Sequence, residues 1–264
     1  MATVLFFHAH PDDEAIATGG TMAKLAASGH RVICVHATRG ELGEVEDGFL
    51  ADGELLGDRR AAEVAEACRI LGVARAEFLG YHDSDMMGRE GNNRADCFWQ
   101  ADVDEAAARL AVILEEEDVD VLVVYDDHGN YGHPDHIQVH RVGVRAAELA
   151  GTRRVYEATF DRDRFRALTT DAASNADVGD VPDTEGVNDQ TFGSPAEAIT
   201  TRVDVTGFLE QKRRAMAAHA SQISETSFFL DMPDDAFVKW WGTEDFIRRG
   251  APDGTAEDSL VNSL

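Results

Sequence analysis

Cysteine and long apolar runs are scarce in this chain, and each scarcity excludes a class of protein. The 264 residues contain only three cysteines, Cys34, Cys68 and Cys97, with no CxxC spacing. An odd number at wide spacing argues against a disulfide scaffold or a cysteine-ligated zinc site, and it favours a reducing compartment, so we expect a cytoplasmic protein. No run approaches the roughly 20 apolar residues of a membrane helix, and the N-terminus lacks the features of a signal peptide.

Positive charge is also in short supply. The chain has 50 Asp and Glu residues against 24 Lys and Arg, a formal net charge of −26, and its only lysines are Lys24, Lys212 and Lys239. An acidic surface repels the phosphates of nucleic acids and of anionic membranes, so we expect neither a nucleic acid nor an anionic membrane surface as a partner. Because long apolar runs are lacking, we also expect no membrane insertion. The acidity has two interpretations, a solvated acidic surface or adaptation to a salt-rich cytoplasm in which salt screens self-repulsion.

What the chain does contain is an alternation of apolar, β-rich runs with helical patterns over residues 1–160. Strands are expected at 3–9, 31–37, 77–80, 121–125 and 155–160, with helices at 13–28, 58–71, 103–118 and 134–150. This alternation indicates an α/β fold with a doubly wound, mostly parallel, Rossmann-like sheet and helices on both faces. The hydrophobic content of 44% suffices for the core of a single domain spanning 1–264.

The pattern changes beyond this core. Residues 169–199 are rich in Asp, Ser, Gly, Thr and Asn, which predicts a long loop or insertion. An edge strand is expected at 202–205, and an amphipathic helix at 207–222 opens a C-terminal helical part that reaches residue 250. The aromatic residues of 228–241 are expected to cap one end of the core or the site.

Histidine and aspartate are concentrated in two segments that directly follow expected strands. Residues 8–14 (HAHPDDE) follow the first strand, and residues 131–136 (YGHPDH) follow the strand at 121–125. In doubly wound sheets, ligands bind beyond the carboxyl ends of the strands, where the strand order reverses. The two strands would be neighbours there, so we expect the two segments to meet in one crevice.

Together these segments offer a His-x-x-Asp pair and a distant histidine. Two imidazoles and one carboxylate leave a coordination position open for water, which is typical of catalytic zinc. The same donors also form the facial triad of non-haem iron(II), and the sequence does not separate these metals. If Asp13 binds the metal, the adjacent Asp12 is left to accept a proton from water.

The second segment adds groups that can act on a substrate. If His136 binds the metal, His133 lies beside it, over the substrate position. Asp135 would hold His133 in its charged form and raise its pKa, which suits stabilisation of an oxyanion or protonation of a leaving amine. Tyr131 is placed to donate a further hydrogen bond. Each segment alone is equally well explained as a capped helix start, but their corresponding positions after buried strands favour a metal site.

At these two segments the chain resembles the PIG-L/LmbE-like family of metal-dependent N-deacetylases. The AHPDDE stretch of that family is unbroken at 9–14, and its HPDH stretch is unbroken at 133–136. Further segments similar to family landmarks are 38–41 (TRGE), 79–84 (LGYHDS) and 212–222 (KRRAMAAHASQ). Asp85, where the family often has Gly, and the segment 169–199 depart from the family pattern, and both lie where substrate choice would be made.

The resemblance implies a zinc ion bound by His10, Asp13 and His136, with Asp12 as the general base. It further implies removal of an acetyl group from an N-acetylglucosamine-type amide by metal-activated water. The small-molecule partner would therefore be an N-acetylated amino sugar, and the in-cell metal is zinc or iron(II).

The resemblance also assigns the remaining site residues. His133, supported by Asp135, would be the acid or oxyanion stabiliser, assisted by Tyr131. Arg60 and Asp83 fall where members similar to the mycothiol-pathway enzymes contact the sugar.

Three other functions remain open at this stage. The nearest is an amidase that cleaves a mycothiol-type thiol conjugate with the same chemistry. A nucleotidyl transferase of the HxGH type would need a glycine in the motif and a basic phosphate site, and a non-catalytic sugar-binding relative would show a lost metal ligand. The oligomeric state, including a homo-oligomer, is also left open.

Overall fold

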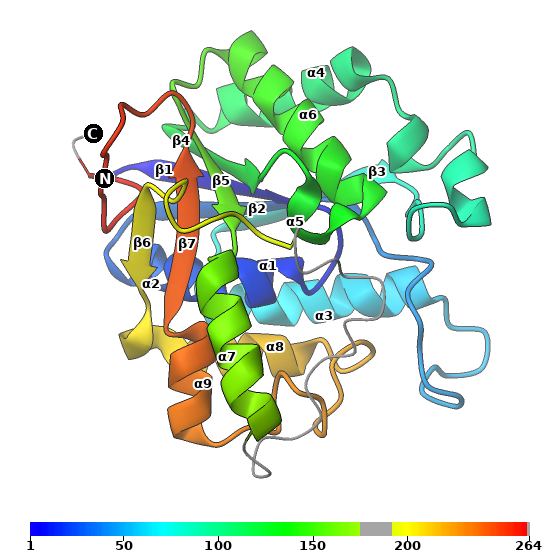
Figure 1. Cartoon of the computed structure of the whole chain (residues 1–264). Coiled ribbons are helices and arrows are strands. Elements are labelled where there is room, and N and C mark those ends of the chain that lie inside the picture. The colour runs from blue at the N-terminus through cyan, green and yellow to red at the C-terminus, as the bar shows by residue number, and fades with distance from the viewer. Residues whose placement is uncertain (175–191, 263–264) are drawn as a thin grey trace.

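The sheet that carries the two motifs is visible in a computed structural model that describes residues 1–174 and 192–262 (Figure 1). It is a mixed α/β fold in which a seven-stranded sheet, in the order β3-β2-β1-β4-β5-β7-β6, is flanked by helices. The strands are β1 (Thr3–His8), β2 (Arg31–Thr38), β3 (Arg75–Tyr81), β4 (Val121–Tyr125), β5 (Arg154–Thr159), β6 (Thr201–Asp204) and β7 (Thr243–Arg248).

Nine α-helices and three short 3₁₀ helices connect the strands of the described residues. The α-helices are α1 (Asp13–Ala17), α2 (Gly19–Ala27), α3 (Leu56–Leu71), α4 (Val103–Glu116), α5 (Gly129–Gly132), α6 (Pro134–Ala150), α7 (Arg162–Ser174), α8 (Leu209–Ala218) and α9 (Asp234–Trp241). The 3₁₀ helices are η1 (Glu90–Asn93), η2 (Phe98–Gln100) and η3 (Thr206–Phe208). Among the helices within 1–174 and 192–262, none is long and apolar enough to span a membrane.

Five strands of the sheet run parallel. β1 pairs with β2 on one side and with β4 on the other, β3 pairs with β2, and β5 pairs with β4. All five residues of β4 are buried, because helices cover both faces of the sheet and the strand is accordingly a continuous apolar run. β7 and β6 extend the sheet beyond β5 in antiparallel pairing.

The helices form a layer on each face of the sheet (Figure 1). α4 packs against α6 on one face, and α8 packs against α1, α2 and α3 on the other. α6 begins with Pro134 at its first position, where the missing N–H needs no partner, and its C-cap Gly151 takes the left-handed conformation at φ 72°. The two histidine- and aspartate-rich segments thus lead from buried strands into the helices of opposite layers.

Most expected elements of the first 160 residues are present, with shifted ends. The expected helix at 13–28 is interrupted at Thr18, which separates α1 from α2. The helix expected from Asp58 begins at Leu56, and the helix expected at 207–222 is the shorter α8. The edge strand expected at 202–205 is β6, which lies at the edge of the sheet.

Two expectations for the C-terminal half are wrong in part. Residues 169–174 belong to α7 rather than to a loop, because the Asp161 carboxylate accepts the N–H groups of Asp163 and Arg164 and so caps a helix start. Residues 192–199 form a loop with a turn at 196–198 and an isolated bridge between Ser194 and Asp161, and residues 175–191 lie outside the described part. The part expected to be helical up to residue 250 also contains β7, which pairs with β5.

Candidate active site

The two motif segments meet because they leave adjacent parallel strands. Val4 and Phe6 of β1 lie in register with Val121 and Val123 of β4, so the two chains emerge side by side at the same edge of the sheet. The first segment then turns into α1, and the second continues through the short α5 into α6. Segments about 120 residues apart in the chain therefore form one site, as predicted.

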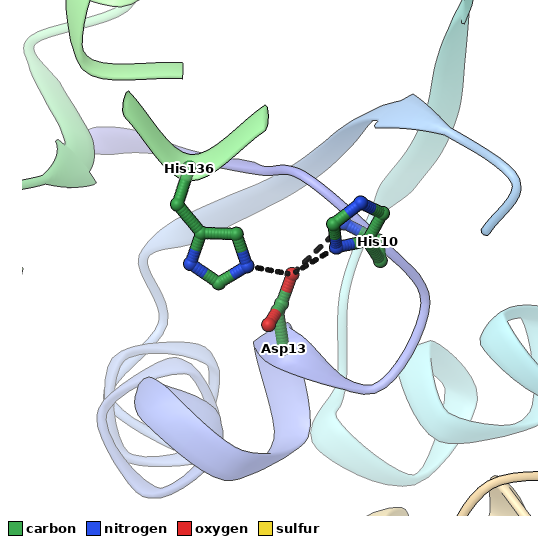
Figure 2. Close-up of side chains that lie close together, drawn as sticks. All are labelled: His10, Asp13 and His136. Carbon is green, nitrogen blue, oxygen red and sulfur yellow. Dashed lines mark hydrogen bonds and ion pairs between the residues drawn. The ribbon is translucent and has the colours of Figure 1, made fainter. Parts of the chain in front are cut away.

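Three side chains of these segments converge on one point (Figure 2). The Asp13 Oδ2 atom lies 3.3 Å from His136 Nε2 and 3.6 Å from His10 Nδ1. A tetrahedral zinc ion with bonds of 2.0–2.2 Å holds its ligands roughly 3.4 Å apart, so these separations fit such an ion. The donor set of two imidazoles and one carboxylate fits the same metal class.

A second group of residues that could hold a metal ion also contains His10. Ligand atoms of His10, Asp83 and His133 lie within 4.8 Å of one another, as do those of His10, Asp13 and His136. His10 Nε2 is 3.6 Å from Asp83 Oδ1 and 3.1 Å from Asp135 Oδ2. His10 therefore stands at the centre of the site, with carboxylates on more than one side.

The site favours a positive charge. Burial by itself would lower the pKa of His10, but the surrounding carboxylates raise the pKa of this imidazole well above its usual range. Burial opposes ionisation of Asp13 as well, yet the imidazoles of His136 and His10 hold the pKa of this carboxyl well below its usual range. An environment that stabilises an added proton on His10 also suits a divalent cation.

Asp12 is held in a strained backbone conformation. Its φ angle is 103°, in the left-handed region that residues other than glycine rarely adopt. Its N–H donates to Glu14 Oε2 at 3.0 Å, and its carboxylate accepts from Arg60 Nη2 at 3.2 Å. Burial raises the pKa of the Asp12 carboxyl to about 6, against the opposing effect of the Arg60 guanidinium. The side chain is thus fixed beside the group of His10, Asp13 and His136 without belonging to it.

Glu14 connects this strained turn to distant parts of the fold. Its carboxylate, which is fully buried, accepts from His219 Nε2 at 2.6 Å and lies 3.0 Å from His36 Nε2. Burial opposes ionisation, but these two histidines hold the pKa of Glu14 well below its usual range. A buried, ionised carboxylate with three partners is a rigid support for the Asp12 backbone.

Arg60 and Asp83, the expected sugar contacts, both lie at the site and are both buried. Arg60 donates to the backbone carbonyls of Gly40 and Pro11 as well as to Asp12. Asp83 accepts the N–H of Leu42 at 3.2 Å and faces His10. Arg60 therefore holds the loop at Gly40 and the Asp12 carboxylate in place, whereas Asp83 faces the His10 imidazole at the centre of the site.

The predicted relation between Asp135 and His133 is wrong. The Asp135 carboxylate accepts from the N–H and hydroxyl of Ser84 and lies beside His10, and it is the Asp135 backbone N–H that donates to His133 Nδ1 at 3.1 Å. Burial, reinforced by His10 and His136, lowers the pKa of His133 to about 2 rather than raising it. The reason is geometric, since Asp135 lies in the first turn of α6, after the N-cap residue His133, and its carboxylate pairs with Ser84 and His10.

Two tyrosines contact His136. The Tyr131 hydroxyl lies 3.4 Å from His136 Nε2. The Tyr125 ring stacks on the imidazole at a centroid distance of 4.4 Å and an interplanar angle of 13°. Tyr125 is itself anchored by its hydroxyl, 2.8 Å from Nδ1 of the buried His8. Tyr131 therefore lies at the site as predicted, and Tyr125 is an additional support.

Sequence reasoning missed the supporting residues rather than the metal group. Glu14 belongs to the first motif, but its partners His36 and His219 lie 22 and 205 positions away. His219 falls in the segment 212–222, and that resemblance was the one signal that pointed to it. Nothing in the sequence pattern marked Ser84 as the partner of Asp135.

The chain is similar to a well-defined group of proteins. The family model described as "PIG-L: GlcNAc-PI de-N-acetylase" matches residues 5–147. A 1D-myo-inositol 2-acetamido-2-deoxy-alpha-D-glucopyranoside deacetylase of Acidothermus cellulolyticus is 40% identical, over 100% of this chain and 94% of its own length. The protein of the same name from Thermobifida fusca is 44% identical, over 84% of this chain and 83% of its own length.

Two solved structures are similar in fold to this chain. The N,N'-diacetylchitobiose deacetylase of Pyrococcus horikoshii is 25% identical, with a TM-score of 0.56 over 93% of this chain and 83% of that chain. The conserved protein TT1542 of Thermus thermophilus, at 23% identity and a TM-score of 0.59, shares the fold. Because the family model covers more than half of the chain and the relatives cover most or all of it, this protein belongs to the PIG-L family of GlcNAc-PI de-N-acetylases.

Proposed function

We propose that this chain is a metal-dependent hydrolase that removes the acetyl group from an N-acetylglucosamine-type amide. The observation that carries the proposal is the convergence of His10, Asp13 and His136 on one point, with Asp12 held beside them. The curated relatives bear the name of a deacetylase of an inositol-linked acetamido sugar, which supports a small N-acetylated amino sugar as the substrate. The products would be acetate and the free amine.

In this proposal His10, Asp13 and His136 hold the metal, which is zinc, or iron(II) as the alternative that the donors also suit. When bound, such an ion lowers the pKa of water and polarises the amide carbonyl. The separations of 3.3 and 3.6 Å between the ligand atoms support this assignment.

Asp12 is the proposed general base. Its carboxylate lies next to the metal ligand Asp13, and its raised pKa suits it to accept a proton from the attacking water. The same group can then pass the proton to the amide nitrogen, so that the amine leaves protonated. Arg60 holds the carboxylate in position for both transfers.

His133 and Tyr131 are the proposed donors to the oxyanion. Because His133 Nδ1 accepts the Asp135 N–H, the ring proton lies on Nε2, which is left to donate. His133 therefore acts as a neutral hydrogen-bond donor rather than as an imidazolium acid. The Tyr131 hydroxyl, next to His136, supplies a second donor, and donors aimed at developing charge are a major source of rate enhancement.

On the sugar side we propose that Asp83 accepts hydrogen bonds from hydroxyl groups. Arg60 contributes by shaping the loop at Gly40. The strand order β3-β2-β1-β4-β5 supports a Rossmann-like, doubly wound core with the site where the order reverses, and we propose that residues 1–264 form one domain. Three free, buried cysteines support a reducing, cytoplasmic location.

The function can be tested by an amine-release screen of the zinc-loaded protein with fluorescamine. The substrates are N-acetylglucosamine, its inositol conjugate, chitobiose with N-acetyl groups and a mycothiol-type thiol conjugate. We expect amine release from the acetylated sugars, with the inositol conjugate the best substrate. Cleavage of the thiol conjugate alone would favour the amidase alternative, and no release from any of them would refute the proposal.

A further inference from the structure

We propose that a cavity beside the site binds the acyl side of the substrate, so that this chain hydrolyses amino-sugar amides whose acyl group is an apolar chain longer than acetyl. The inference rests on the proposed function and names a substrate class within it. Three observations support it: the position of the cavity next to the proposed catalytic residues, its largely apolar walls, and the location of the proposed sugar contact Asp83 outside it.

The cavity opens directly from the proposed catalytic residues. Its volume is about 380 Å³, and Asp12, Asp13, Tyr131 and His136 form one end of it. Pockets for small molecules have volumes of about 300–1,000 Å³, so this space is large enough for a ligand group of its own. The methyl group of an acetamide would fill only a small part of it.

The walls of the cavity are aromatic. The Trp240 ring packs edge-on against Phe228 at a centroid distance of 4.9 Å and against Phe165 at 5.6 Å. Phe165 in turn contacts Phe192 at 4.3 Å, and Leu168 adds an aliphatic side chain. Rings that pack against one another hold their positions without a ligand, so the apolar space is already formed.

Away from the proposed catalytic residues, the charged side chains of this wall are Arg164 and Asp161, and both are already engaged. Asp161 accepts the N–H groups of Asp163 and Arg164 and pairs with Arg202. Arg164 donates to Asp245 at 2.5 Å and to the carbonyl of Thr243. Gln222 donates to the carbonyls of Glu44 and Ser221, so among the described residues of the apolar wall Asn130 Oδ1 and Trp241 Nε1 are the buried side-chain atoms without a partner. One acceptor and one donor are too few for the hydroxyl groups of a second sugar, and the wall offers no free cation for an anion. An alkyl or aryl group has no such need and gains free energy by leaving water.

The polar groups proposed to bind the sugar are on another side of the metal triad. Asp83, the proposed sugar contact, approaches His10, whereas the cavity meets the triad at Asp13 and His136. Within the described residues, the cavity lining includes neither Asp83 nor Arg60. An amide whose sugar faces Asp83 directs its acyl carbon substituent away from the sugar, toward the cavity.

The aromatic wall of the cavity is formed by the C-terminal half of the chain. Its residues come from positions 160–241, beyond the segment 5–147 that the family model covers. The metal ligands and the base fall inside that segment. The chemistry is thus encoded in one part of the sequence and the acyl preference in another.

The reaction needs no further reactant. Water oxygen forms a bond to the acyl carbon, the C–N bond breaks, and both water protons pass to the nitrogen, the first of them through Asp12, so that the amine leaves as an ammonium group. The products are the amino sugar and the carboxylate of the longer acyl chain, so atoms and charge balance as they do for acetate.

The first test compares three amides with the zinc-loaded protein: N-acetylglucosamine, N-octanoylglucosamine and octyl N-acetylglucosaminide. Each buried methylene contributes about a fourfold gain in binding, so we expect kcat/KM for N-octanoylglucosamine to exceed that for N-acetylglucosamine by at least tenfold. An equal or lower value would overturn the proposal. The same gain with the octyl glycoside instead would assign the cavity to the aglycone and would also overturn it.

Two leucine variants test whether the cavity wall causes the preference for the longer acyl chain. Leu168, half-buried on α7, lines the cavity, and Leu149, at the exposed end of α6, does not. Leu168→Gln should lower the octanoyl-to-acetyl ratio of kcat/KM about fivefold, and Leu149→Gln should leave that ratio unchanged. Equal ratios in the two variants would contradict the assignment.

Direct binding separates this proposal from the proposed function. Trp240 and Trp241 line the cavity, so tryptophan fluorescence of zinc-loaded Asp12→Asn protein reports on its occupancy. N-octanoylglucosamine should bind at least tenfold more tightly than N-acetylglucosamine, and Leu168→Gln should reduce that difference. If neither amide is hydrolysed but this difference persists, the proposed function fails and the cavity assignment stands; if the difference is absent, the cavity assignment fails whatever the activity.

Discussion

The carboxylate of Glu14 accepts the backbone N–H of Asp12 at 3.0 Å and so ties the strained turn of the proposed base to a buried network. Glu14→Gln removes one acceptor oxygen from a group that serves three donors. We expect kcat to fall about tenfold, with KM and metal content close to those of the wild type, because the base loses its position rather than its chemistry.

A matched control for this substitution is Glu63→Gln. Glu63 is another buried carboxylate, and it accepts from the N–H and hydroxyl of Ser221 without contacting Asp12. Its substitution should leave kcat nearly unchanged. Equal losses of kcat in the two variants, or metal loss that parallels the loss of activity, would show that Glu14 has only a general structural role.

Asp12→Asn tests the base itself. The amide is isosteric and cannot accept the proton, so kcat should fall by about 10²- to 10⁴-fold while about one metal ion per chain remains bound. Amine release and elemental analysis on the same preparation provide both numbers. Asp127→Asn, at an exposed position, is the control and should behave as the wild type. Unimpaired turnover by Asp12→Asn would refute the assignment.

The sequence predicted the site where short-range signals and topology agreed. The apolar run at 121–125 and the proline at 134 located β4 and the start of α6, and parallel neighbours then brought both motifs together. These features depend on local patterning and on the general rule that ligands bind at the carboxyl ends of parallel strands.

The features that the sequence did not predict depend on contacts between residues that are far apart in the chain. β7 was missed because it is stabilised by pairing with β5 and β6 rather than by a clear apolar alternation of its own. The partner of Asp135 was assigned to its neighbour His133, whereas the fold brings Ser84 and His10 to that carboxylate. Local spacing identifies which residues reach the site, but not which of them pair.

A buried ion pair supports the layer of helices that carries α1. The Lys212 ammonium, fully buried, donates to Glu244 at 2.5 Å and to the carbonyl of Ile16 at 2.7 Å. Burial lowers the pKa of Lys212, and Glu244 opposes that effect. Lys212→Met should reduce the free energy of unfolding by about 3–5 kcal/mol, because it leaves the Glu244 charge buried without its cation.

Urea denaturation measures this change. Lys239→Met, which removes an exposed lysine from α9, is the matched control and should alter the free energy of unfolding by less than about 0.5 kcal/mol. A Lys212→Met variant as stable as this control would contradict the role of the ion pair.

Stability should also depend on pH through Glu117. Hydrogen bonds from Arg31, with a further contribution from Arg75, lower the pKa of Glu117 from 4.5 to about 2. Because the folded pKa is the lower one, the stabilisation is complete above pH 4.5 and is lost as the pH falls toward 2. Glu117→Gln should therefore remove about 1 kcal/mol of the difference in unfolding free energy between pH 5 and pH 2. This value is small because solvent screens the charge of Arg31, whose side chain is exposed. Glu115→Gln, at an exposed neighbouring position, should leave the pH profile as it is, and an unchanged profile in Glu117→Gln would exclude this source.

The central claim is that the turns after β1 and β4 bind one divalent ion between them. Elemental analysis of zinc-reconstituted wild type, His136→Ala and His140→Ala measures it most directly. His140 lies one helical turn from His136, and its Nδ1 donates to the Tyr125 carbonyl at 2.9 Å, whereas His136 faces Asp13. We predict about one zinc ion per chain in the wild type and in His140→Ala, and none retained by His136→Ala. Full zinc occupancy in His136→Ala would contradict the account.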